Sequence, residues 1–399
     1  MYRIGFIFTL ITIFCCCIGC KEKRSEQLTP WGTPMEQRIE ESIDTSSTGM
    51  ALSDIINNGE LIMLTLTGPE NYYDYHGHGM GTQYLLCEKF TQTIGVALRV
   101  EVCRDTTELL QRLNRGEGDI IACALPMNKK GRLLYAGVVD KEKGTSWAVE
   151  RTNKELADTL NNWFKPSMVA QVKKQENWML STASITRHVY SPMLDKGKGV
   201  ISNYDHLFQK YAPIARWDWR LLAAQCYQES TFDPKAHSWA GACGLMQIMP
   251  STAERLGLPH DQLYEPEPNI AAAARYISQL DAKFQDVPSR VERISFVLAS
   301  YNGGYSHVRD AMALAKKHGK DQYRWPDVSE FILRLSDSKF YNDPVVKYGY
   351  MRGAETYDYV QRIQGRWNEY RGMSRGTGFH ISPGTVTPQR ATKKYRYHV

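Results

Sequence analysis

The strongest constraint on the fold is a helix that carries a carboxyl group in its last turn. Residues 219–229 read WRLLAAQCYQE, with apolar side chains at three- and four-residue steps, and Asp218 stands where an N-cap residue belongs. This pattern lays one helix face on a core and puts Glu229 at the end of it. The negative end of the helix dipole and desolvation by nearby aromatic residues both favour a protonated carboxyl group. A raised pKa suits a general acid near neutral pH; the alternative is an exposed Glu at a frayed helix end.

A glycine-rich loop follows at residues 241–250, with the sequence GACGLMQIMP. Glycine permits positive φ angles and lets a polymer backbone or a sugar ring approach closely. Apolar residues such as Met246 bury the segment, and the Gln247 amide can both donate and accept hydrogen bonds. An ordinary strand–turn–helix connection is the alternative. Ser251 and Glu254 predict a capping box that opens the next short helix.

Two further segments are rich in tyrosine. Tyr301-Asn302-Gly-Gly follows an apolar helix predicted over residues 291–299, and a second helix is predicted from Tyr305 onward. Because Asn-Gly-Gly terminates helices, a simple turn is the alternative here. The last segment, residues 349–360, reads GYMRGAETYDYV and predicts a closing helix.

In this order and spacing, the four segments resemble the soluble lytic transglycosylase family, whose catalytic domain is an α-helical, lysozyme-like fold of the goose type. The resemblance implies that Glu229 is the catalytic residue and that Tyr359, with Tyr357 as its rival, points at it. It also implies a set of saccharide-binding residues, namely Ser230, Gly244, Met246, Gln247, Tyr301, Asn302 and Tyr359. The expected partners are therefore the glycan strands of peptidoglycan.

The number of carboxyl groups near these motifs bears on the reaction. Glycosidases that hydrolyse their substrate usually need two acids. Here Asp233 is predicted to cap a turn and Glu254 to close the capping box, while Asp310 and Glu355 are predicted to lie on helical surfaces. Glu229 alone suffices if the N-acetyl group of the substrate assists at C1 and its C6 hydroxyl then attacks.

We therefore expect a peptidoglycan lyase that acts without water. It cleaves the β-1,4 bond between N-acetylmuramic acid and N-acetylglucosamine and leaves 1,6-anhydro ends, with Glu229 acting first as acid and then as base. Two alternatives remain open. One is a goose-lysozyme-like muramidase that uses water; the other is a non-catalytic wall-binding or solute-binding lipoprotein.

The start of the chain predicts its compartment. Residues 1–19 have a positive start and an apolar run, as in a lipoprotein signal peptide, and the run is too short for a stable membrane span. Residues 17–20 (CIGC) resemble a bacterial lipobox, which implies that Cys20 becomes the lipid-anchored N-terminus; ordinary cleavage nearby is the alternative. Because Lys21 is not an aspartate, the lipoprotein sorting rules favour the outer membrane, facing the periplasm. Residues 20–50 predict a polar tether.

Residues 51–165 alternate predicted strands and helices, which indicates a parallel sheet. The predicted strands are 59–66, 97–102 and 118–124, and the predicted helices are 81–95 and 106–115. This stretch resembles the first lobe of family 3 extracellular solute-binding proteins, which the transglycosylase F family carries ahead of its catalytic domain.

The second lobe of such a binding protein is not visible in the sequence. After residues 127–132 the chain soon reaches residues 146–163, which resemble the return to lobe one. A one-lobed module has no clamshell to close on a ligand, so we expect it to be a scaffold and not a sensor. The predicted fold class is therefore α/β plus α, a one-lobed binding-protein-like module followed by a lysozyme-like domain.

The remaining segments are a connection at 166–200, the catalytic domain at 201–370 and a basic tail at 371–399. The tail holds six Lys or Arg and no acid, which equals the chain's surplus of +6. It either attracts anionic wall polymer or lipid headgroups, or is a solvated tail. Five cysteines follow residue 20, so at least one thiol is free, and a Cys226–Cys243 bridge is left open. No cofactor, metal site or nucleic-acid partner is expected, and the oligomeric state is left open.

Overall fold

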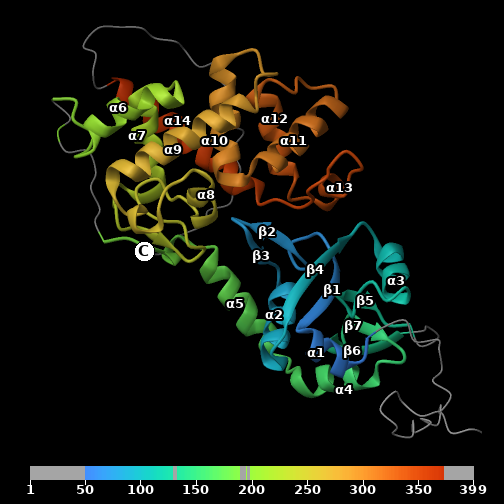
Figure 1. The fold of residues 1–399 in the computed structure, drawn as a ribbon. Helices are drawn as coiled ribbons and strands as arrows, with labels where there is room; N and C mark the ends of the chain where they lie inside the picture. Colours follow the sequence, from blue (N-terminus) through green and yellow to red (C-terminus); the bar gives the residue numbers. More distant parts are fainter. Residues whose placement is uncertain (1–49, 129–132, 189–194, 196–197, 373–399) are drawn as a thin grey trace, which may run out of the picture. The chain divides into compact units, whose positions relative to one another are not determined.

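The computed structural model describes residues 50–128, 133–188, 195 and 198–372. The predicted signal peptide, Cys20, most of the tether and the basic tail from residue 373 lie outside these residues. All described residues belong to one compact unit, which contains an α/β module and a helical domain (Figure 1). Within the described ranges, no helix is both long enough and apolar enough to cross a membrane.

The α/β module is built on a five-stranded sheet of order β4-β1-β5-β7-β6. The strands are β1 (Glu60–Leu66), β4 (Ala97–Cys103), β5 (Ile120–Pro126), β6 (Leu133–Asp140) and β7 (Thr145–Glu150). β1 runs parallel to β4 and β5, as predicted, whereas β7 is antiparallel to both β5 and β6. The expectation of a purely parallel sheet is therefore wrong at one edge, because only a short turn joins β6 to β7 and such a turn joins antiparallel strands.

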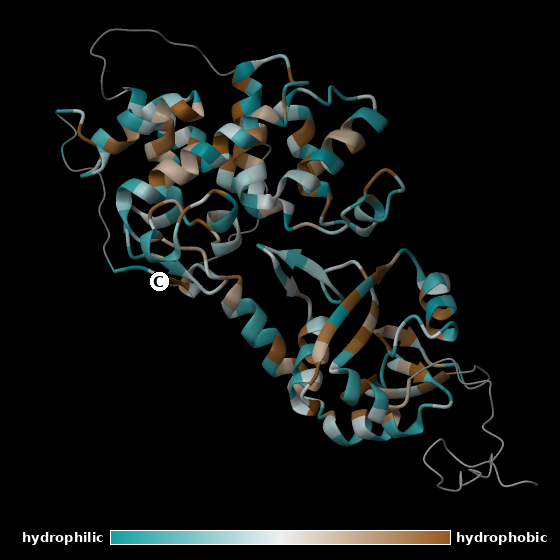
Figure 2. Cartoon of the chain, in the orientation of Figure 1, coloured by the Kyte–Doolittle hydropathy of each residue, from teal (hydrophilic) through white to brown (hydrophobic). Residues whose placement is uncertain are grey.

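Helices cover both faces of this sheet, as the prediction of a buried sheet requires. One face packs on α1 (Leu52–Asn58), α2 (Thr82–Ile94), α4 (Lys154–Trp163) and α5 (Ser167–Met179), and the other packs on α3 (Thr106–Asn114). Alternate residues of β1 face the two sides: Leu61 and Met63 join the first cluster, and Leu64 joins the second. Figure 2 shows brown, apolar strands between helices that are largely hydrophilic on their outer faces.

Two short pairings were not predicted, and both reach the helical domain. The first is a hairpin of β2 (Tyr73–Tyr75) and β3 (His78–Met80), with the His76-Gly77 turn between its strands. The second joins β8 (Ile185–Thr186), which follows α5 and the 3-10 turn η1 (Thr182–Ser184), to β9 (His237–Ser238).

The helical domain surrounds one continuous hydrophobic core, in which buried helix α7 packs against α6 and α14. Its helices are α6 (Asp205–Ala215), α7 (Trp219–Ser230), α8 (Pro250–Arg255), η2 (His260–Gln262), α9 (Pro266–Ala282), α10 (Arg290–Gly303), α11 (Tyr305–Lys317), α12 (Trp325–Arg334), α13 (Ser338–Tyr341) and α14 (Gly353–Gly372). The predicted N-cap of α7 is correct, since the Asp218 carboxylate accepts a hydrogen bond from Arg220 N at 2.9 Å.

Two local predictions about helix ends are wrong. Helix α10 does not stop before the Tyr301-Asn302 turn but continues through it, and Gly304 takes the C-terminal position with a φ of +87°. Helix α8 starts at Pro250 with Met249 as its N-cap, so the predicted capping box of Ser251 and Glu254 does not form. The N-cap position falls on Met249, which has no side-chain oxygen to accept from the first turn.

Candidate active site

Glu229 lies in the last turn of α7, at the floor of a cavity of about 780 Å³. The helix ends there because Thr231 and Phe232 both adopt positive φ angles, +56° and +64°. Three neighbours of Glu229 along the helix, Leu222, Ala223 and Cys226, are fully buried, as the apolar pattern predicted. Surrounding atoms desolvate the carboxyl group and raise the pKa of Glu229 from 4.5 to about 8. The group is therefore protonated at neutral pH.

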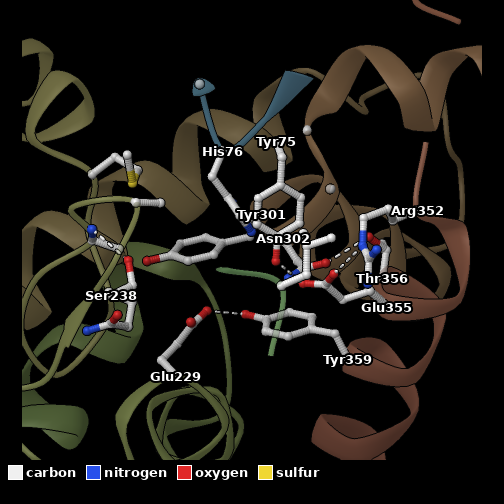
Figure 3. Close-up of a pocket in the computed structure, with 18 of the residues that line it drawn as sticks. Tyr75, His76, Glu229, Ser238, Tyr301, Asn302, Arg352, Glu355, Thr356 and Tyr359 are labelled. Atoms are coloured by element: carbon white, nitrogen blue, oxygen red, sulfur yellow. Dashed lines mark hydrogen bonds and ion pairs between the residues drawn. The ribbon is translucent and has the colours of Figure 1, made fainter. Parts of the chain in front are cut away.

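The Tyr359 hydroxyl donates a hydrogen bond to Glu229 Oε1 at 2.5 Å (Figure 3). Tyr359 comes from α14, which packs directly on α7. Its oxygen in turn accepts a hydrogen bond from Gln225 Nε2 at 3.1 Å, so Gln225, Tyr359 and Glu229 form a chain. A hydrogen bond to the ionised carboxylate lowers the pKa of Glu229, and this opposes the larger effect of burial. Of the two tyrosines considered, Tyr359 lines the cavity and Tyr357 does not.

Arg187 is a pocket residue that the sequence did not reveal. It directly follows β8, whose pairing with β9 brings the chain from the α/β module to the cavity wall. Its positive charge lowers the pKa of Glu229, as a third and smaller influence. The Arg187 Nε is buried and has no hydrogen-bond partner within the described part of the chain. An unpaired cationic donor in a cavity is suited to an anionic or carbonyl group of a ligand.

The loop at 241–250 forms a tight turn in front of α9, but only part of it faces the cavity. Gly244 has a φ of +77°, and an added Cβ would lie 2.5 Å from the Leu263 carbonyl oxygen. Glycine is therefore needed here for close packing inside the domain. Met246 is fully buried, and its backbone N donates to Asn269 Oδ1 at 2.9 Å. The expectation that Gly244 and Met246 line the saccharide cleft is therefore not met, since neither belongs to the cavity lining.

Gln247 does line the cavity, and its amide holds the loop closed. Its Nε2 donates to the carbonyl oxygens of Ala236 at 3.1 Å and of Gly244 at 2.9 Å. Gln247 adopts a φ of +46°, which a non-glycine residue rarely does, so the turn is held in place by these contacts.

Ser230 does not face the cavity either. It is fully buried, and its hydroxyl donates to the carbonyl oxygen of Cys226 at 3.2 Å, one helical turn back. Neighbours in a helix point about 100° apart, so a residue next to Glu229 need not share its surface. The structure therefore places Ser230 in the packing behind the cavity wall, and its expected role in saccharide binding stays a prediction.

Tyr301 and Asn302 both line the cavity from the last turn of α10. The Tyr301 hydroxyl donates to the carbonyl oxygen of Met246 at 2.8 Å, which links α10 to the glycine-rich loop. Asn302 Oδ1 accepts a hydrogen bond from the Thr356 hydroxyl at 2.7 Å, which links α10 to α14. Both residues thus connect the elements that surround Glu229, as Figure 3 shows.

The other carboxyl groups differ from what the sequence suggested. Glu355 lines the cavity, but both of its oxygens are engaged: Oε1 accepts from the Tyr75 hydroxyl at 2.8 Å and Oε2 from Arg352 Nε at 3.2 Å. Asp310 is buried, not on a surface, and accepts from the backbone N of residues 347 and 348. Asp233 is buried and accepts from Lys235 N at 2.9 Å, which agrees with a local cap.

All five described cysteines are free and buried, so Cys226 and Cys243 do not form a bridge. Burial raises the pKa of the Cys226 thiol well above its ordinary value. Cys243 instead lies near the imidazole of His237, and its Sγ is 3.3 Å from the Tyr264 hydroxyl. In the portion of the chain that the structure describes, no group of His, Cys, Asp and Glu side chains is arranged to hold a metal ion.

Comparison with known proteins adds independent information. Residues 206–324 match the family model of the Transglycosylase SLT domain. A protein of Desulfosudis oleivorans, named "Membrane-bound lytic murein transglycosylase F", is 31% identical over 291 residues, which cover 68% of this chain and 61% of that protein. A protein of the same name from Enterobacter sp. (strain 638) is 28% identical over 439 residues, which cover 84% of this chain and 81% of that protein.

The Enterobacter alignment is longer than this chain of 399 residues, so part of that relative has no counterpart here. Among solved structures, the arginine-bound form of domain 1 from TmArgBP is 18% identical and covers 30% of this chain and 99% of that chain, with a TM-score of 0.26.

Residues 206–324 of the helical domain, which include Glu229, thus belong to the part of the chain that matches the Transglycosylase SLT domain. The chain as a whole is similar to proteins named membrane-bound lytic murein transglycosylase F, and it spans 61% of the length of the first of them.

Proposed function

We propose that this protein is a lytic transglycosylase that cleaves the β-1,4 bond between N-acetylmuramic acid and N-acetylglucosamine in peptidoglycan. The observation that carries the proposal is Glu229, an acid with a pKa of about 8 at the floor of a cavity, held by the Tyr359 hydroxyl. The SLT domain match and the names of the similar proteins support the choice of substrate.

In the first half of the reaction, protonated Glu229 acts as a general acid. It donates its proton to the glycosidic oxygen while the C1–O bond breaks, and the N-acetyl group of the muramic acid stabilises the positive charge that develops at C1. Desolvation keeps Glu229 protonated in the resting state, so no second carboxyl group is needed to begin the reaction.

In the second half, the Glu229 carboxylate acts as a general base. It takes the proton of the C6 hydroxyl while O6 forms a bond to C1, which closes the 1,6-anhydro ring and restores the protonated acid. Tyr359 stabilises the carboxylate between the two halves, because its hydroxyl already donates to Oε1 and leaves Oε2 for the substrate. The net reaction consumes no water.

A hydrolase would need a second group to activate water. Three further carboxylates line the cavity, namely Asp74, Glu355 and Asp358. Tyr75 and Arg352 hold both oxygens of Glu355, Asp74 Oδ1 accepts from Gly77 N at 3.0 Å, and Asp358 Oδ2 lies 3.9 Å from Arg362 Nη2. Oxygens that are already held by other side chains are poorly placed to activate a water molecule. This arrangement favours the intramolecular reaction over the muramidase alternative.

We propose Gln247, Tyr301, Asn302 and Tyr359 as substrate-contacting residues, since all four line the cavity that holds Glu229. Gln247 and Asn302 offer amide groups, which pair well with the hydroxyl and N-acetyl groups of a sugar. Ser230, Gly244 and Met246 keep a supporting role behind this surface.

The proposal places the enzyme in the cell envelope, anchored by a lipid on Cys20, at the outer membrane and facing the periplasm. Support comes from the lipobox-like residues 17–20 and from relatives that are named membrane-bound. A Cys20→Ser protein should move from the membrane fraction to the soluble fraction. Its continued sedimentation with membranes would argue against this anchor.

The decisive experiment for the reaction is to digest purified peptidoglycan and weigh the products. We expect muropeptides that end in 1,6-anhydro-N-acetylmuramic acid, each one water lighter than the corresponding lysozyme product. Glu229→Gln serves as the matched inactive control. Reducing ends alone would make the protein a muramidase, and no soluble products from the parent enzyme would leave it without the proposed activity.

A further inference from the structure

The hairpin of β2 and β3 belongs to the α/β module by sequence, yet it lines the catalytic cavity. Tyr73 through Gly77 all contribute to the lining, opposite the residues of α10 and α14. Figure 3 shows Tyr75 and His76 descending from this hairpin toward the space above Glu229 and Tyr359. The cavity wall is therefore made partly by a segment that lies more than 120 residues before the start of the matched SLT domain at residue 206.

Specific contacts hold the hairpin in this position. The Tyr75 hydroxyl donates to Glu355 Oε1 at 2.8 Å, and the Arg352 guanidinium lies 5.9 Å from the centre of the Tyr75 ring. The other strand is held separately, since His78 Nε2 lies 2.8 Å from the carbonyl oxygen of Ala240. Two independent anchors therefore fix the hairpin on the catalytic domain.

The hairpin also forms an aromatic surface inside the cavity. The rings of Tyr75 and Trp239 are parallel within 2°, with their centres 6.1 Å apart, and both residues line the cavity. Trp239 follows β9, so the pair combines one ring from each part of the chain. Sugar rings present flat C–H faces, and aromatic rings bury such faces while their edges hold polar partners.

Two imidazoles add polar groups to the same side of the cavity. His76 adopts a φ of +52° at the hairpin turn, a conformation that costs energy for a residue with a side chain. His307 lies on α11, and burial lowers its pKa to about 4, so its ring is neutral at neutral pH. The His307 Nδ1 is buried and has no partner among the residues that the structure describes. Such a nitrogen is free to bond a hydroxyl or amide group of a ligand.

We propose that the β2–β3 hairpin forms a saccharide subsite, in which the paired rings of Tyr75 and Trp239 support a sugar of the glycan strand beside the one that Glu229 cleaves. The proposal rests on the proposed function. It assigns the α/β module a direct part in substrate binding, because the module supplies one wall of the cleft. It also explains why the hairpin is anchored twice, since a sugar-binding ring must be held in one position.

The test measures binding and not turnover. In a Glu229→Gln background, the affinity for soluble glycan strands freed of their peptides is measured by calorimetry, for the parent and for three hairpin variants. Tyr75→Ala removes the ring and should weaken binding about 5- to 20-fold, which corresponds to the loss of one aromatic contact. Tyr75→Phe keeps the ring and loses only the hydrogen bond to Glu355, so its affinity should stay within about threefold of the parent.

His78→Ala is the control for docking, because it removes the second anchor and keeps both Tyr75 and Trp239. It also removes a ring whose centre lies 5.3 Å from that of Trp239, so the control includes any effect of that neighbour. Its affinity should also stay within about threefold of the parent. In the Glu229-containing enzyme, Tyr75→Ala should raise KM by a similar factor to its loss in affinity and leave kcat within about threefold. Circular dichroism and thermal unfolding check that each variant is folded.

Three results would overturn the subsite. One is a folded Tyr75→Ala protein that binds the strands as tightly as the parent. Another is an equal loss in Tyr75→Phe or His78→Ala, which would reduce the hairpin to a docking element. The third is no binding by the Glu229→Gln parent at strand concentrations that the active enzyme processes. The proposed function fails separately, if the unmodified enzyme yields no anhydro products.

Discussion

The helical domain and the α/β module differ in what lies at the end of a central element, α7 in the first and β1 in the second. In the helical domain, the end of α7 opens into a cavity and presents a desolvated acid to it. In the α/β module, the carboxyl end of β1 is where an open parallel sheet would normally hold a ligand. That end is instead packed against the helical domain, since Thr67 Oγ1 accepts a hydrogen bond from Tyr350 N at 3.0 Å.

The packing at this edge leaves little space. Gly349 has a φ of +74°, and a Cβ on it would lie 2.4 Å from Thr67 Oγ1; a Cβ on Gly68 would lie 3.2 Å from the Tyr341 hydroxyl. Beyond it, at the carboxyl end of β5, a cavity of about 470 Å³ has no charged residue in its lining, which consists of Thr106, Leu110, Asn114, Leu125, Pro126, Asn128, Leu133 and Tyr135. The comparison teaches that the carboxyl end of β1 serves as a packing surface for the helical domain, whereas the end of α7 lines a cavity.

The largest expected effect concerns the acid. Glu229→Gln should lower the rate of peptidoglycan cleavage at least ~100-fold, the usual contribution of a positioned general acid or base. The other carboxylates of the cavity lining, Asp74, Glu355 and Asp358, are held in contacts of their own. The matched control is Glu254→Gln, an exposed residue on α8, which should keep normal turnover. Turbidity loss of a peptidoglycan suspension measures both. Near-normal turnover by a folded Glu229→Gln protein would remove Glu229 from the mechanism.

Thermal unfolding of the Glu229→Gln protein tests whether the carboxyl group of Glu229 is buried. Glu229 has a folded pKa of about 8 against an ordinary 4.5, so its protonated form favours the folded state. That contribution is complete below pH 4.5 and is lost as the pH rises through about 8. Glu229→Gln has no proton to lose, so it should unfold at a higher temperature than the parent at pH 9 and at a similar temperature at pH 4. Equal midpoints at both pH values would mean that the carboxyl group is well solvated.

A smaller effect is expected at the tyrosine. Tyr359→Phe should lower kcat about 10-fold, because the carboxylate formed halfway through the reaction loses its charge-assisted hydrogen bond. Activity should fall as the pH rises through the pKa of Glu229, since the protonated acid is lost. Removing a donor to the ionised form raises the pKa of Glu229, so this alkaline limb should move to higher pH in the variant. An unmoved or lowered limb would contradict the assigned contact.

Two glycine-to-alanine substitutions test the contact between the α/β module and the helical domain. Gly349 and Gly95 have nearly the same backbone angle, φ +74° and +76°, but only Gly349 has neighbours within 4 Å. Both Ala variants carry the left-handed strain of about 1 kcal/mol, and only Gly349→Ala adds a clash, so it should lose about 1–3 kcal/mol more in the free energy of unfolding. Urea unfolding curves compare them. Equal losses would show that the sheet edge is not packed as described.

The smallest expected effect is none at all. Free amino acids and short wall peptides should change neither the melting temperature nor the turnover, because the module lacks the second wall that buries a small ligand, and a ligand without differential binding shifts no equilibrium. Calorimetry with basic, acidic and apolar amino acids tests this. A saturable, micromolar signal that disappears on deletion of the α/β module would show that one lobe still senses a ligand.

Much of this arrangement was open to prediction where the signals are local. The spacing of Leu222 and Cys226, together with the Asp218 cap, identified α7 and put Glu229 at its end. The alternation of apolar segments and helices identified β1, β4 and β5. In each case neighbouring residues decide the structure, so a single sequence suffices.

The rest depends on contacts between distant segments. The β2–β3 hairpin gives no sign in its own sequence that Tyr75 reaches Glu355, 280 residues later. Ser230 follows Glu229 directly in the sequence but is fully buried, because neighbouring residues of a helix point about 100° apart. The β6–β7 hairpin is the exception, since its two strands are neighbours in the sequence and were nevertheless not predicted.

The pairing of β8 with β9 limits where a gene fusion can join the helical domain to another protein without losing part of the cavity. Ile185 and Thr186 form ladder partners with Ser238 and His237, and Trp239 N donates to the Ser184 carbonyl oxygen. The matched SLT segment begins at residue 206, but Arg187 already lines the cavity, and its charge lowers the pKa of Glu229. A gene fusion that starts at residue 206 would contain Glu229 but would lack Arg187, the nearby positive charge. Selection on such hybrids should therefore favour crossovers upstream of residue 182, which keep Arg187 and the β8–β9 pairing with Glu229.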